Sequence, residues 1–150
     1  MEITRQADYA VRAVLHVARL ADGTRAPTSA IAQEQGIPLP FLAKIISQLA
    51  VAGIVDAMRG ASGGVRLARS PSDITMLDVI QVIDGPVALN RCVNGTDACP
   101  YTPSCPMHEV WCDAQADLVK RLSSTSFADL AVRAEVLERQ VTEEAQATPA

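Results

Sequence analysis

The order of elements predicted between residues 27 and 69 constrains the fold of this chain more than any other feature of its sequence. The segment holds two short helical patterns followed by two short β patterns, at 27–36, 40–52, 54–58 and 65–68. Gly36 marks a tight turn between the helices, and a glycine-rich tip joins the strands. An ordinary helical hairpin would explain the first pair alone. The β-hairpin that follows it favours a winged helix-turn-helix.

Further helical patterns flank this segment on both sides. They predict a first helix over 3–20, a short helix over 76–84, a long helix starting at Cys105 or Pro106, and a last helix over 127–144. Thr75 and Asp78 have the spacing of a capping box for the short helix. Pro40 is expected at the first position of its helix, and Thr28 or Ser29 as the cap of the preceding one. The predicted fold class is therefore mainly α with a small β-hairpin wing.

These boundaries divide the chain into five regions. They are a winged helix-turn-helix region at 1–70, a connecting helix at 71–91, a Cys-rich loop at 92–106, dimerisation and C-terminal helices at 107–144, and a disordered tail at 145–150. Charge divides along similar lines, because residues 1–70 hold eight basic and five acidic side chains, whereas 71–150 hold five and twelve. The formal net charge of −4 therefore does not exclude a DNA-binding N-terminal half.

Composition and patterning exclude several other classes. Charged residues interrupt every apolar run before it reaches the length of a transmembrane helix or a signal-peptide core, so we expect a cytoplasmic protein without a membrane partner. One Trp, two Tyr and two Phe are too few for a platform that stacks single-stranded nucleic acid. In a reducing compartment, four cysteines indicate metal or redox chemistry more than a disulfide framework.

The glycine-rich tip of the hairpin lies between basic residues. Gly63 and Gly64 let the backbone approach a surface closely, and Arg59 and Arg66 supply positive charge for phosphates. Ser62 belongs to the same tip. A nucleotide-binding loop is the alternative, but this tip lacks the Lys-Ser/Thr ending of a P-loop and precedes a strand. We therefore predict a wing that contacts DNA.

Cysteines cluster in a loop rich in Pro and Gly, with the spacing Cys92-x6-Cys99-x5-Cys105, and His108 follows. Three thiolates and one imidazole can close a four-ligand set for zinc or for an iron–sulfur centre. Zinc sites usually contain a Cys-x2–4-Cys pair, so the wider spacing favours the larger centre. Inert thiols are the alternative, and this reading is stronger for Cys112. No Cys-x-x-Cys pair or orienting third residue indicates a thiol enzyme, so we predict no enzymatic activity.

The long helix carries an apolar stripe that a small domain can bury only with difficulty. Its members are Met107, Val110, Trp111, Ala114, Leu118 and Leu122. Packing against helices of the same chain is one explanation. A dimer interface is the other, since a winged helix that binds a twofold-symmetric operator needs a second copy. We predict a homodimer.

Five stretches together resemble one family, the winged-helix iron–sulfur cluster transcriptional regulators that include IscR, NsrR and RirA. They are ITRQADYAVRAVLHVA, SAIAQEQGIPLPFLAKIISQLAVAGIV, the wing RGASGGVRLAR, ITMLDVIQVIDG, and the cysteine loop running into CPMHEVW. The resemblance covers the chain to about residue 140. It implies a homodimer that binds double-stranded operator DNA and holds one iron–sulfur cluster per subunit, of the 2Fe–2S or 4Fe–4S type.

The resemblance also implies which residues hold the cluster. Cys92, Cys99 and Cys105 match the three cysteine ligands of the family. His108 matches a histidine ligand found in one branch, and Asp8 matches an aspartate that the second subunit donates in another. This sequence has both, so the fourth ligand stays open.

On the DNA side, the resemblance marks the start and exposed face of the recognition helix. The matching residues there are Pro40, Phe41, Lys44, Ser47 and Gln48. Lys44 and Gln48 are candidates for contacts to bases or phosphates, and Thr28 and Ser29 for a phosphate at the preceding helix. The family implies a regulator whose DNA affinity follows cluster state in response to iron, redox conditions or nitric oxide. The alternative is the same fold controlled by thiol oxidation or braced by zinc.

Overall fold

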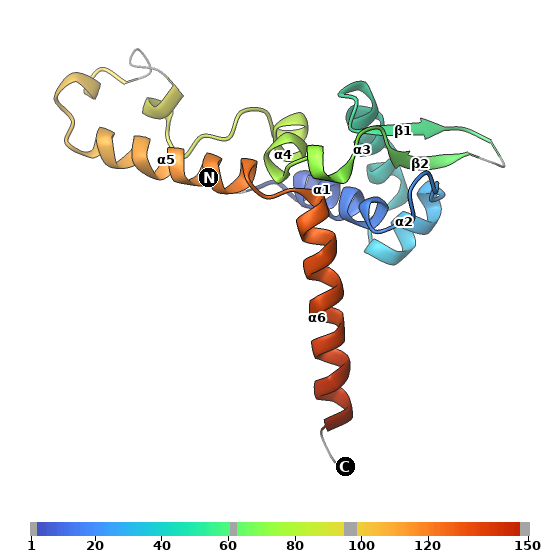
Figure 1. The fold of residues 1–150 in the computed structure, drawn as a ribbon. Helices are drawn as coiled ribbons and strands as arrows, with labels where there is room; N and C mark the ends of the chain where they lie inside the picture. Colours follow the sequence, from blue (N-terminus) through green and yellow to red (C-terminus); the bar gives the residue numbers. More distant parts are fainter. Residues whose placement is uncertain (1–2, 61–62, 95–98, 148–150) are drawn as a thin grey trace.

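The computed structural model describes residues 3–60, 63–94 and 99–147 (Figure 1). Its main elements are α1 (Arg5–Ala18), α2 (Thr28–Gln35), α3 (Leu39–Val51), β1 (Val55–Met58), β2 (Gly64–Leu67), α4 (Met76–Asp84), α5 (Met107–Ser123) and α6 (Phe127–Ala147). Short 3-10 turns lie at η1 (Pro71–Asp73), η2 (Arg91–Asn94) and η4 (Thr102–Ser104). The predicted fold class, mainly helical with a β-hairpin wing, is confirmed.

Helix α1 forms the centre of the winged-helix body and contacts α2, α3, α4, α6 and β2. Its buried face consists of Ala7, Ala10, Ala13, Val14 and Val17, at helical spacing. Three of these five side chains are alanines, which let neighbouring helices approach α1 closely. Phe127, fully buried at the start of α6, attaches the last helix to the same core.

The turn between α2 and α3 contains Gly36 as predicted, but both helices begin at a different residue from the predicted one. Gly36 ends α2 in the left-handed conformation, with a φ of 61° that favours glycine. Pro27, not Thr28 or Ser29, occupies the cap position of α2, and none of the described side chains caps this helix. The predicted cap is therefore wrong, because the helix begins one residue early, at Thr28. Likewise α3 begins at Leu39, so Pro40 is its second residue.

The wing is an antiparallel hairpin in which Val55 pairs with Leu67 and Met58 with Gly64. Ala26, just before α2, adds two backbone hydrogen bonds to the hairpin, from its N to Val65 O (2.9 Å) and from Val65 N to its O (2.8 Å). Gly64 has a φ of +136°, and a Cβ there would lie 2.8 Å from Ala26 O. Glycine is therefore required where the wing meets the chain that enters α2.

Helices α5 and α6 leave the winged-helix body in different directions (Figure 1). The capping box of Thr75 and Asp78 is present at the start of α4, as predicted. Gln115 fixes α5 to the preceding segment, because its amide donates to Val87 O (2.7 Å) and accepts from Leu89 N (2.9 Å). In the described part of the chain, no helix has the length and apolarity that a membrane span needs.

The boundaries of the last two helices differ from the prediction. Helix α5 starts at Met107, after Pro106 at its cap, so Cys105 lies outside the helix in extended backbone. Helix α6 continues to Ala147, three residues beyond the end predicted at residue 144. The remainder of the predicted tail, 148–150, lies outside the described residues.

Candidate functional site

The recognition helix α3 buries one face and exposes the other. Leu42, Ile45, Ile46 and Leu49 form its buried face. Pro40, Phe41, Lys44 and Ser47 are exposed, as the assignment of α3 to DNA recognition requires. Gln48 is half-buried.

One feature of the helix-turn-helix was not evident from the sequence, and another was expected from it. Gln48 Oε1 accepts a hydrogen bond from Gln6 Nε2 at 2.7 Å, so α1 orients this candidate for a contact to a base or a phosphate. Thr28 and Ser29 form the first turn of α2, where the backbone N–H groups lack helical partners and can meet a phosphate. The helix-turn-helix therefore presents polar groups from α2 and α3.

The wing carries an ion pair across its two strands, which the composition does not reveal. Arg66 is exposed and pairs with Asp56 on the facing strand, with Nη2 2.9 Å from Oδ2. Arg59 is exposed at the end of β1. A Cβ at Gly63 would lie 2.3 Å from Met58 O, so the tip excludes larger residues there. Ser62 lies outside the described residues.

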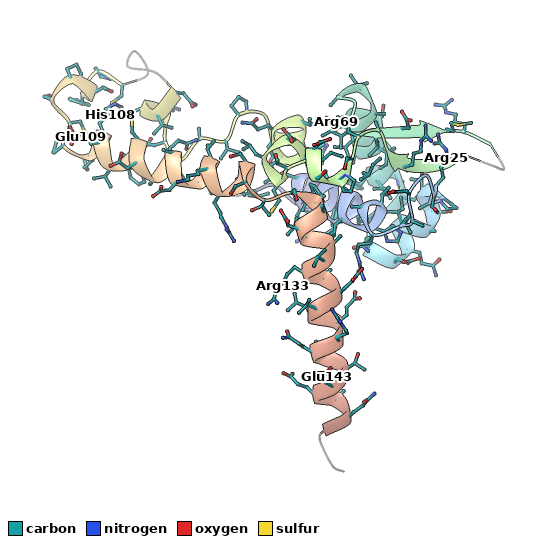
Figure 2. All side chains as sticks on the ribbon, viewed as in Figure 1. Arg25, Arg69, His108, Glu109, Arg133 and Glu143 are labelled. Atoms are coloured by element: carbon teal, nitrogen blue, oxygen red, sulfur yellow. The ribbon has the colours of Figure 1, made fainter. Side chains whose placement is uncertain are left out.

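Arg25 is a wing residue that sequence reasoning missed (Figure 2). Its Nη1 donates to Gly64 O at 3.1 Å and to Asp56 O at 3.3 Å, which ties the chain before α2 to both strands. No local signal indicates this role, because it depends on the pairing of Ala26 with Val65. Arg25 therefore helps to fix the angle of the wing relative to the helix-turn-helix.

Cys92, Cys99 and Cys105 line one open pocket of about 450 Å³. The pocket lies at the N-terminal end of α5, far from the winged-helix body (Figure 1). Met107 and Trp111 supply part of its apolar wall. All three cysteines are free and half-buried. The three cysteines that the spacing singled out therefore line the same pocket.

The two candidate fourth ligands lie outside this pocket. His108 stands at the first turn of α5 (Figure 2), and its ring lies against Cys112, with Sγ 3.7 Å from Nε2 and 3.9 Å from Nδ1. Cys105 precedes α5, so it and His108 do not share a helix face. Asp8 lies on α1, where its carboxylate is 2.6 Å from Arg12 Nη2. Over the described ranges, no three Cys, His, Asp or Glu side chains are already gathered as metal ligands.

The predicted dimer stripe of α5 splits into two parts. Met107, Val110, Trp111 and Ala114 are exposed, with 61%, 66% and 39% exposure for the first three. Leu118 and Leu122 are half-buried by their own chain. None of the residues of α5 is fully buried in the described part of one chain. An apolar face therefore remains uncovered near the cysteine pocket, and we refer to Met107, Val110, Trp111 and Ala114 as the α5 apolar face.

Known proteins resemble the chain along nearly its whole length. The Rrf2 family, described as iron-dependent transcriptional regulators, matches residues 3–133. Rv1287 of Mycobacterium tuberculosis, proposed to be an HTH-type transcriptional regulator, is 38% identical over 132 residues, which are 87% of this chain and 81% of that protein.

Two solved structures share the fold and part of the sequence. CymR, the global cysteine regulator of B. subtilis, has a TM-score of 0.76 at 26% identity and covers 89% of this chain and 98% of its own. T. potens IscR has a TM-score of 0.69 at 27% identity, with coverage of 100% and 94%. The winged helix, the cysteine-containing segment and α5 all lie within the matched length. The chain therefore belongs to the Rrf2 family of transcriptional regulators.

Proposed function

We propose that this protein is a homodimeric regulator that binds operator DNA, with an affinity controlled by an iron–sulfur cluster at Cys92, Cys99 and Cys105. The observation that carries the proposal is that these three cysteines line one pocket. Thiolates are the ligands that iron–sulfur clusters use most, and Met107 and Trp111 add apolar surface beside them. A bound cluster supplies a redox-sensitive cross-link between the turns of the loop.

The winged-helix body supplies the DNA contacts in this proposal. The exposed face of α3 enters the major groove, while the wing follows the neighbouring backbone. In a dimer, the two α3 helices meet successive major grooves, about 34 Å apart. The α5 apolar face is the surface that a second subunit covers, so the position of α5 sets this separation.

The chain itself links the cysteine pocket to that separation. Cys92 lies on η2, three residues after Leu89, and Gln115 of α5 is hydrogen-bonded to Leu89 N and Val87 O. Cys105 directly precedes α5. Thiols held on one centre therefore fix the connection between α4 and α5, whereas free thiols leave it less constrained. This difference in the α4–α5 connection changes the spacing of the two α3 helices, and so changes their fit to the DNA.

A gel-shift titration of reconstituted and metal-free protein tests the proposal. Anaerobically reconstituted protein is expected to bind its operator with an affinity clearly different from that of apo-protein, at each point of a salt series. Cys99→Ser is expected to remove the difference. Cys112→Ser is the matched control, because Cys112 lies outside the pocket, and it is expected to keep the difference. Equal affinities for reconstituted and apo-protein would contradict cluster control.

The alternative function is control by thiol oxidation or by bound zinc on the same fold. Two observations support control by thiol oxidation or zinc. The fold is similar to that of CymR, a cysteine regulator, and the cysteines are free and half-buried. Elemental analysis separates the two functions. A brown protein with iron, sulfide and visible charge-transfer bands supports the cluster, whereas a colourless protein with stoichiometric zinc, or with neither metal, supports the alternative.

A further inference from the structure

One side-chain hydrogen bond joins the recognition helix α3 to the first helix of the chain. Gln6, the second residue of α1, donates from Nε2 to Oε1 of Gln48 at 2.7 Å, across 42 residues of sequence. Both side chains are half-buried. Because the carbonyl oxygen of Gln48 is bonded to α1, this contact fixes which way the Gln48 amide faces.

The other end of the Gln48 amide is not used within the chain. Gln48 Nε2 donates to none of the described residues, and it is not one of the enclosed side-chain nitrogens that lack a partner. The amino group therefore reaches the surface of α3, where its N–H bonds can meet an external acceptor. Lys44 lies one turn earlier on the same side of α3, is exposed, and has donors only.

We propose that Gln6 makes Gln48 a hydrogen-bond donor toward DNA, and that Gln6 is thereby a positioning residue for operator recognition. The acceptor is an oxygen or nitrogen of the DNA, on a base edge or on a backbone phosphate. This inference rests on the DNA binding in the proposed function, and not on control by a cluster.

The direction of the Gln48 amide determines which base edges suit it. A free glutamine pairs with adenine through both ends of its amide, since it donates to N7 and accepts from the N6 amino group. With Oε1 bonded to Gln6, Gln48 is left to donate, which suits purine N7, guanine O6 and thymine O4. Cytosine offers only its N4 amino donor in the major groove, and it is therefore disfavoured at this position.

Gln6→Glu separates the direction of the amide from the packing of α1 against α3. A carboxylate can only accept, so it keeps the tie by accepting from Gln48 Nε2, and the carbonyl oxygen of Gln48 then faces outward. Gln6→Leu removes the tie and releases the amide. Gln33→Glu is the matched control for the added charge, because Gln33 is exposed on α2 and undergoes the same chemical change.

A double-mutant cycle in DNA binding tests the assignment. Full-length reconstituted and apo-protein are titrated by fluorescence anisotropy against a duplex that the wild-type protein selects from a random pool, and against its base-substituted versions. Relative to Gln33→Glu, Gln6→Glu is expected to weaken binding about fivefold, on the order of one hydrogen bond, without lowering the thermal midpoint. In the Gln48→Ala background, Gln6→Glu is expected to cause no further loss. The loss in Gln6→Leu is expected to be smaller, because the released amide can still donate.

The two sources of the acceptor give different patterns of loss. If the acceptor is on a base edge, the loss is confined to duplexes that carry an acceptor at one base pair, and Gln6→Glu turns the preference there toward adenine or cytosine. If the acceptor is a phosphate, the loss is equal for every duplex.

Other outcomes overturn the inference or the function on which it rests. If Gln6→Glu binds every duplex as Gln33→Glu does, the role of Gln6 is excluded. A lowered thermal midpoint, with a binding loss that adds to that of Gln48→Ala, makes Gln6 a packing residue only and also overturns the inference. A wild-type protein that selects no duplex overturns the DNA binding itself, whereas equal binding by reconstituted and apo-protein overturns cluster control alone.

Discussion

His108 and Asp8 compete for the role of fourth ligand, and their surroundings differ. The His108 ring lies against the thiol of Cys112, outside the pocket formed by the other three cysteines. Asp8 is on α1, whose helix lies in the winged-helix body, away from the pocket of the same chain (Figure 1). In the proposed function, Asp8 can therefore reach the cluster of one subunit only from the second subunit. Since the Asp8 side chain is 55% exposed, it is accessible to such a contact.

We expect opposite effects on the stability of the cluster when the two candidate ligands are substituted. If Asp8 of a second subunit is the fourth ligand, Asp8→Ala removes an oxygen ligand, and we expect it to speed iron loss from the reconstituted protein about tenfold. His108→Ala is expected to leave the cluster intact, since the ring already contacts Cys112. Absorption and Mössbauer spectra of the anaerobic proteins measure both effects. Destruction of the cluster by His108→Ala would instead identify the histidine as the ligand, and two intact clusters would exclude both residues.

At the scale of elements, α3 combines a buried apolar face with an exposed face of modest charge. Lys44 is the one basic residue within α3 and it is exposed. Residues 1–70 carry only a small positive net charge, so each placed cation matters for phosphate binding. Affinity therefore depends on a few positioned contacts rather than on a broad basic surface.

Lys44→Ala is expected to weaken operator binding and to reduce the salt slope of log K by about one, because one phosphate contact is lost. Lys120→Ala is the matched control, since it removes the same charge from an exposed position on α5. Fluorescence anisotropy across a salt series measures both slopes. A lower affinity with an unchanged slope would place Lys44 on a base edge instead of a phosphate.

Helix α6 is tied to α1 by an ion pair between Arg19 Nη2 and Glu138 Oε2 at 2.6 Å. The hydrogen bond that Arg19 donates to the Glu138 carboxylate lowers the pKa of Glu138 and raises the pKa of Arg19. A carboxylate with a lowered pKa stabilises the fold at neutral pH, and this contribution is lost as the pH falls through the lowered pKa. The stabilisation linked to the raised pKa of Arg19 is present at neutral pH and is lost only at strongly alkaline pH.

Glu138→Gln is therefore expected to lower the thermal midpoint slightly at pH 7, with a difference that vanishes in acid. The effect is small because the pair is exposed to water and salt. Glu143→Gln, on the same helix, is the control. Thermal melts followed by circular dichroism between pH 3 and pH 8 measure the difference, and a gap that widens in acid would contradict the assignment.

Local signals in the sequence predicted elements well, and long-range contacts account for what they missed. The α4 capping box and the turn at Gly36 are encoded within four residues, so the sequence was enough to place them. Arg25 bonds to a strand that follows it by about forty residues, and no local pattern reports such a pairing. Gln6 likewise gave no local signal, because its partner Gln48 follows it by 42 residues.

At the scale of the whole molecule, the chain has two projecting helices and a small body (Figure 1). The body has its own core, built around α1 and closed by Phe127. By contrast, α5 buries none of its residues fully within the described chain, although it carries the α5 apolar face. A helix of this kind is stable in water when a second copy covers it. Because Met107 and Trp111 belong both to the α5 apolar face and to the lining of the cysteine pocket, we expect dimer formation to be coupled to the arrangement of the pocket.

Val110→Asp tests this coupling, because it places a charge in the middle of the α5 apolar face. We expect the variant to sediment as a monomer, because dimer formation would bury an unpaired carboxylate. Operator binding is expected to weaken by a hundredfold or more, on the order of the avidity that two linked half-sites provide. Val132→Asp is the matched control, since Val132 is 64% exposed on α6 and Val110 is 66% exposed on α5. Analytical ultracentrifugation and a gel shift measure the two effects, and a dimer that persists in Val110→Asp would move the subunit interface away from the α5 apolar face.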